Sequence, residues 1–131
     1  MADMDRPLLR NARLVARSRL INIDNGAGTT IDEAFMYHSR AIRLLKAFVL
    51  YTTETAGTVA AATVQIGTTV GGSDVVAATA YGNGATVGTV TALVLAKNEI
   101  PANTMISVRH TGVAATALGE AYIVLEYAVH E

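Results

Sequence analysis

Short β-patterned runs follow one another from about residue 40 to the end, and this succession constrains the fold more than any other feature of the sequence. The clearest runs are 41–51, 58–66, 74–81, 87–95, 104–111 and 120–130. Apolar and β-branched residues alternate within them, and Gly, Asn or Pro stands between them. No helix-length amphipathic stretch separates the runs, so the pattern predicts an antiparallel sandwich or barrel rather than a parallel α/β sheet.

The turns and the number of runs make this prediction more specific. Gly71-Gly72 and the Asn-Gly pair at 83–84 are hairpin signals, and Pro101 favours a turn before the run at 104–111. A helix competes for 41–48, but the β-branched and aromatic residues that follow favour a strand. With two shorter runs at 20–24 and 34–38, the sequence predicts an all-β fold. We expect an antiparallel β-sandwich, jelly-roll-like, with about eight strands and a short basic N-terminal arm.

The positive charge of the chain is concentrated at its start, although the formal net charge is only −1. Half of the ten basic residues are arginines of the first nineteen positions: Arg6, Arg10, Arg13, Arg17 and Arg19. On a helix four of them form one stripe, and as a strand Arg13, Arg17 and Arg19 share a face. We therefore divide the chain into a basic N-terminal arm at 1–19 and a β-sandwich domain at 20–131.

Two interpretations of the arm stay open at this point. It is either a solvated first strand or frayed end, or a segment that docks on an acidic protein surface and orders there. Under the second interpretation the five arginines are the partner-binding residues. We expect removal of 2–19 to leave folding intact and to weaken attachment, since the later strands supply a complete core.

No pattern in the sequence predicts chemistry. The chain has no Cys, and His38, His110 and His130 lie on three separate predicted segments without a second ligand at metal-site spacing. We interpret these histidines as surface or hydrogen-bonded sheet residues. The carboxylates are scattered, and no motif marks a nucleophile. We expect that the protein is not an enzyme and that it has no metal site and no cofactor.

The composition indicates what kind of partner the chain binds. Hydrophobic residues reach 51% and charged residues only 16%, so much of the surface must be neutral. We expect that surface to bind a protein partner or another copy, giving a homo-oligomer (a dimer or trimer). No run of about twenty apolar residues is present, so we expect no membrane contact. A mildly acidic body without aromatic interleaving argues against specific nucleic-acid binding.

Several segments resemble small structural proteins of tailed-phage virions. The likeness lies in the segments 47–51, 64–67, 100–104, 106–108 and 119–127. It covers about residues 40–130 and is closest to the jelly-roll cement or decoration proteins of the capsid shell. Asn103 departs from the pattern, since a glycine is more usual at that position, and the Arg-rich arm need not be shared.

The resemblance implies a mechanical function in the virion, located at the capsid surface. Such a protein binds the outside of the shell, with the major capsid protein as its partner, and reinforces the contacts between capsomers. The alternative is a carbohydrate- or receptor-binding β-sandwich of a phage tail. Sugar-binding faces usually present exposed aromatic rings, and this chain has no Trp and only five Tyr.

Overall fold

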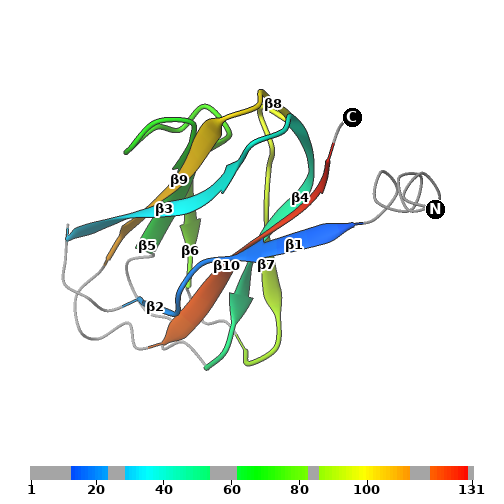
Figure 1. Ribbon diagram of the computed structural model, residues 1–131. Coiled ribbons are helices and arrows are strands. Elements are labelled where there is room, and N and C mark those ends of the chain that lie inside the picture. The colour runs from blue at the N-terminus through cyan, green and yellow to red at the C-terminus, as the bar shows by residue number, and fades with distance from the viewer. Residues whose placement is uncertain (1–12, 24–28, 54–61, 83–85, 113–118, 130–131) are drawn as a thin grey trace.

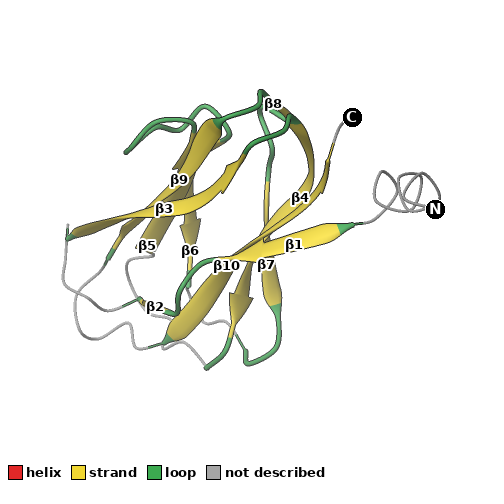
Figure 2. Cartoon of the chain, in the orientation of Figure 1, coloured by secondary structure: helices red, strands yellow, loops and turns green. Residues whose placement is uncertain are grey.

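In the computed structural model the described part of the chain comprises residues 13–23, 29–53, 62–82, 86–112 and 119–129. Within these ranges the secondary structure consists of strands, with loops and turns between them (Figure 2). No helix capable of spanning a membrane occurs in the described ranges. The prediction of an all-β fold is confirmed.

The ten strands form two antiparallel sheets, which we call sheet A and sheet B (Figure 1). Sheet A contains β1 (Leu14–Arg17), β2 (Ile21–Asn22), β4 (Ile42–Tyr51), β7 (Val90–Leu93), β8 (Glu99–Ile100) and β10 (Glu120–Val129). Sheet B contains β3 (Thr30–His38), β5 (Ala62–Gly67), β6 (Val76–Tyr81) and β9 (Thr104–Thr111).

The strand order is that of a jelly roll. Sheet A runs β1-β10-β4-β7 and sheet B runs β3-β9-β5-β6. Strand β2 continues β1 along β10, and β8 continues β7 along β4, so that each pair acts as one interrupted strand. Counted in this way the fold has eight strands in two four-stranded sheets, as the sequence predicted.

The core lies between the two sheets and consists of alternate residues of the paired strands. Sheet A contributes Val49, Ile123 and Leu125, and sheet B contributes Val64 and Ile106, all with an exposed fraction of 0%. Because side chains alternate across a strand, each of these residues is followed by one that points away from the core. The direction of those outward residues decides what the surface of each sheet can do.

The turn before β9 explains the asparagine that departed from the expected pattern. Asn103 has a φ of 59°, in the left-handed region that Gly adopts most readily and Asn more readily than most other residues. Its backbone N–H donates to the carbonyl of His38 at 2.9 Å, and its side-chain oxygen accepts from the Tyr37 hydroxyl at 2.9 Å. The asparagine therefore satisfies the backbone requirement of the turn and also joins it to the end of β3.

The first strand of sheet A lies inside the segment that the sequence assigned to the arm. Residues Leu14–Arg17 pair with β10, and the adjacent Ser18 is 4% exposed. Ser18 donates its N–H to the Ile123 carbonyl and accepts the Ile123 N–H on its hydroxyl, both at 2.9 Å. At Leu14–Arg17 the predicted arm is thus an edge strand of the domain, in which the half-buried Leu14 and Ala16 alternate with the exposed Val15 and Arg17.

Candidate interaction surface

The predicted partner-binding arginines that the structure describes all lie against the domain. Arg13 Nη1 is 3.4 Å from Glu126 Oε1, and Arg19 Nε is 3.6 Å from Glu33 Oε1. The guanidinium carbon of Arg17 lies 4.2 Å from the centroid of the Tyr122 ring. Arg6 and Arg10 lie outside the described residues.

Arg17 and Tyr122 lie on the outer face of sheet A. On this face the strand register aligns the side chains in rows. Directly paired residues of antiparallel strands point to the same side of the sheet. One row is Tyr122, Leu50 and Val90; the next is Arg17, Val124, Phe48 and Ala92; a third is Val15, Glu126 and Lys46. We call these ten residues the sheet A outer face.

This face is unusually apolar for the exterior of a sandwich. Val15 is 62% exposed and Val90 is 53% exposed, while Phe48, Leu50 and Tyr122 are half-buried. Val124 is buried, yet it does not belong to the core cluster between the sheets. Strands β4 and β10 therefore carry apolar residues on both sides, a pattern typical of strands that are covered on both faces.

A β-bulge changes the composition of one edge of this face. The register between β4 and β10 shifts between Glu126 and Tyr127, which leaves Leu45 as the extra residue of β4. Leu45 and Lys46 are consequently both exposed, although they are neighbours in a strand. The Lys46 ammonium lies 5.6 Å from the centroid of the Phe48 ring.

The outer face of sheet B is polar by comparison, and its charges are paired. Register places Asp32 beside Arg109, and Arg109 beside Gln65. Arg109 donates to both carboxylate oxygens of Asp32, at 2.7 and 2.9 Å, and these hydrogen bonds hold the pKa of Asp32 below its usual value. Gln65 donates to the Gly71 carbonyl at 2.8 Å. This is the composition of an ordinary solvated face.

The histidines occupy three different settings. His38 Nδ1 accepts the Arg40 N–H at 3.0 Å, and its ring meets that of Tyr127 edge-on. His110 is 1% exposed and shares a 2.6 Å hydrogen bond between Nδ1 and the Tyr81 hydroxyl. His130 lies outside the described residues. His38 fits the interpretation as a hydrogen-bonded sheet histidine, whereas the buried His110 fits it at Nδ1 but not at Nε2, which has no partner among the described residues.

A buried polar cluster around His110 is the feature that the sequence did not reveal. The Tyr81 ring lies between those of His110 and Tyr51, with ring centroids 5.7 and 6.4 Å away. The Tyr51 hydroxyl lies 2.6 Å from Thr91 Oγ1 and accepts the Gly82 N–H at 2.9 Å. The only available signal was that the polar residues Tyr51, Tyr81 and His110 fall on inward positions of their strands.

The titratable residues of the described ranges form no arrangement that assigns a reaction. Among the described residues, His, Asp and Glu side chains form no group of three or more that could hold a metal ion. That the protein is not an enzyme and needs no cofactor stays a prediction. The described surface is instead differentiated by polarity, with one apolar sheet face and one polar sheet face.

Comparison with known proteins extends the description of the fold. No protein-family model and no curated protein matches the sequence. A chain of the cyanophage Pam1 capsid asymmetric unit has a similar structure, with a TM-score of 0.62 and 11% sequence identity. The match covers 90% of this chain and 85% of that one. In fold, the chain is similar to a phage capsid chain. At this identity the likeness is one of fold, and it extends over nearly the whole of both chains.

Proposed function

We propose that the chain is a structural protein of a phage virion that binds the outside of the capsid shell and reinforces the contacts between capsomers. The observation that carries the proposal is the shared fold with a capsid chain over 90% of this chain and 85% of that one. The partner in this proposal is the major capsid protein.

The physical properties of the domain suit a mechanical function. Its core runs between two four-stranded sheets and is made of fully buried aliphatic side chains such as Ile123 and Ile106. A protein bound at many symmetry-related positions needs only modest affinity at each contact, because linked contacts raise the effective concentration of one another. We include in the proposal that the chain self-associates as a dimer or trimer and that it catalyses no reaction.

The test is the abundance and location of the chain in purified particles of the phage that encodes it. We expect quantitative mass spectrometry to give a copy number in a simple ratio to that of the major capsid protein. A membrane-impermeant amine reagent should label the chain in intact particles if it lies outside the shell. A handful of copies per particle would favour the tail alternative, and absence from particles would refute a virion role.

A further inference from the structure

The sheet A outer face is built like a covered surface, yet its residues Val15 and Val90 are more than half exposed. Its central strands β4 and β10 present Phe48, Leu50, Tyr122 and Val124 outward, in addition to the core residues that they present inward. An antiparallel sheet with one solvated face normally alternates apolar and polar residues. Contiguous exposed apolar surface on a small domain marks a site of association.

We propose that the sheet A outer face is the surface by which the chain docks on the capsid shell, and that the matching shell patch is apolar and bears carboxylates. The proposal rests on the proposed function and adds to it the face and the chemistry of the contact. Two further observations carry it: the charges on this face, and the contrast with the polar face of sheet B.

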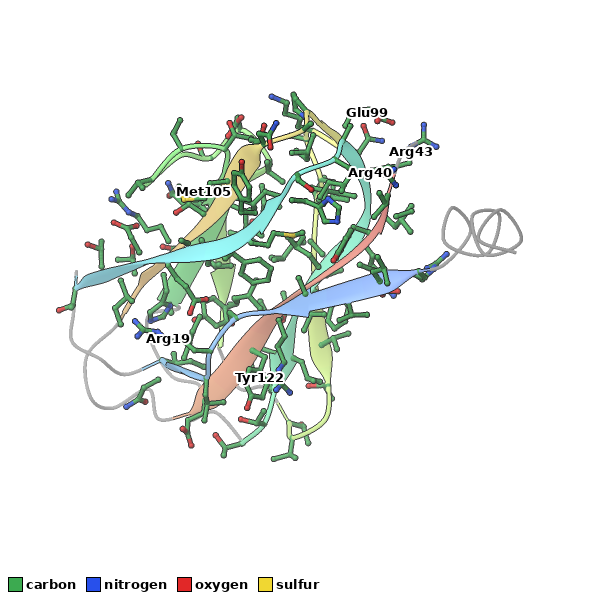
Figure 3. All side chains as sticks on the ribbon, in the orientation of Figure 1. Arg19, Arg40, Arg43, Glu99, Met105 and Tyr122 are labelled. Atoms are coloured by element: carbon green, nitrogen blue, oxygen red, sulfur yellow. The ribbon has the colours of Figure 1, made fainter. Side chains whose placement is uncertain are left out.

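The charges on and beside the face leave two cations without a carboxylate. Among the described residues there, four are basic, Arg13, Arg17, Arg43 and Lys46, and three are acidic, Glu99, Glu120 and Glu126, which leaves a net charge of +1. Arg13 pairs with Glu126 at 3.4 Å, and Arg43 pairs with Glu99 at 2.8 Å; Figure 3 shows Arg43 and Glu99 at the same end of the domain.

The remaining cations, Arg17 and Lys46, form no ion pair within the described part of the chain, and each lies over an aromatic ring of the face. Both side chains are thus exposed to solvent while they lie across the apolar surface. A partner that covers the face must remove both cations from water, and burying a charge is costly unless it is paired. Carboxylates on the partner supply that pairing, and the planar Arg17 guanidinium can accept one in a two-point contact.

A second copy of the chain is a poor occupant of the same face. A two-fold dimer through it would bring the same patch of both subunits together. Each copy would then present a net charge of +1, with the unpaired Arg17 and Lys46, to the same charges of the other, and like charges facing each other in an interface are unfavourable. Self-association of the chain would use other surfaces.

Sheet B provides the internal comparison. Its outer face is lined by Thr30, Thr63 and Thr111, and its one cation, Arg109, is already bound by Asp32 through two hydrogen bonds. Its largely exposed apolar side chain is Tyr37, at one end of the face, whose hydroxyl donates to Asn103, and the described residues of this face include no unpaired cation. The two faces of one sandwich thus differ in the properties that distinguish a docking surface from a solvated one.

The experiment measures binding of the purified full-length chain to shells prepared without it, by co-sedimentation at several salt concentrations. Arg17→Gln combined with Lys46→Gln should weaken binding about tenfold or more, and Val90→Ser about fivefold. The matched controls are Lys97→Gln, which removes an exposed cation that lies 3.6 Å from Asp74, and Val70→Ser, at a valine that is 64% exposed. Both control positions lie outside the sheet A outer face, and these variants should bind like the parent.

Two further measurements separate loss of contact from loss of fold. Urea unfolding should give midpoints close to that of the parent for every variant used. Arg17→Lys with Lys46→Arg keeps both charges and should retain most of the affinity. In the parent, an amine reagent should modify Lys46 in the free chain and should be blocked when the chain is bound to shells.

Each contrary outcome has a distinct meaning. If the parent binds shells and the face variants bind equally well, the docking face is wrong while the proposed function stands. If the parent does not bind shells, the proposed function fails and this inference falls with it. If the parent forms a dimer and Val90→Ser dissociates it, the occupant of the face is a second copy of the chain. If Lys46 is protected from the amine reagent in the free chain, and deletion of residues 2–12 removes that protection, the occupant of the face is residues 2–12 of the chain itself.

Discussion

The buried imidazole of His110 should make the protein lose stability as the pH falls below the ordinary pKa of histidine. The ring is 1% exposed and lies against Tyr81, whose hydroxyl is 2.6 Å from Nδ1. Nε2 has no hydrogen-bond partner of good geometry among the residues that the structure describes. Burial lowers the pKa of His110 from 6.5 to about 4, and a weaker interaction with the Asn22 backbone opposes this shift.

The loss of unfolding free energy follows from the difference between the pKa of His110 in the unfolded chain and its pKa in the folded chain. In the unfolded chain His110 takes up its proton near pH 6.5, whereas in the folded chain it does so near pH 4. Between these values the unfolded state binds more protons, so stability is complete above about pH 6.5 and is lost as the pH falls towards 4. A separation of this size is worth roughly 3 kcal/mol of unfolding free energy.

The assay is urea unfolding at a series of pH values from 7 to 4, followed by circular dichroism. We expect the parent to lose roughly 3 kcal/mol over this range. His110→Gln removes the titrating group but retains a polar side chain, and its unfolding free energy should change much less with pH. His38→Gln is the matched control and should keep the slope of the parent. Equal slopes for the parent and His110→Gln, or a His110 titration near pH 6.5 by NMR, would refute the reasoning.

Three other predictions concern the sheets and their turns. Deletion of residues 2–19 was expected from the sequence to leave folding intact, but because it removes β1 and leaves an edge of β10 unpaired, it should lower the unfolding free energy by on the order of 2–4 kcal/mol and promote aggregation; an unchanged urea midpoint would contradict this. Asn103→Ala should cost about 1–2 kcal/mol, since alanine disfavours a φ of 59°, whereas Asn103→Gly should cost less; the reverse order in thermal unfolding would argue against strain. Leu125→Ala should cost about 2–5 kcal/mol by urea unfolding, and the exposed Val15→Ala should stay near the parent; equal losses would contradict the assignment of the core.

The architecture could be predicted from the sequence because its main signals are local. Alternation within 104–111 and 120–130 matches β9 and β10 almost residue for residue, since a strand repeats every two residues whatever its neighbours are. Turn residues such as Pro101 and Asn103 mark where the chain must reverse. The spacing of these signals was sufficient to predict eight strands and a jelly-roll-like sandwich.

The tertiary structure decided the features on which function depends. Local pattern made 14–17 equally acceptable as arm and as strand, and only the free edge of β10 selects the strand. The pattern of β4 and β10 shows apolar residues in both registers, but a sequence does not tell which of the two faces meets the other sheet. Pairing places Phe48 and Val124 on the outer side, together with Arg17 and Lys46 from strands that are distant in the sequence. The sequence by itself therefore determined the strands and the core, while the candidate docking face exists only because strand order brings those residues together.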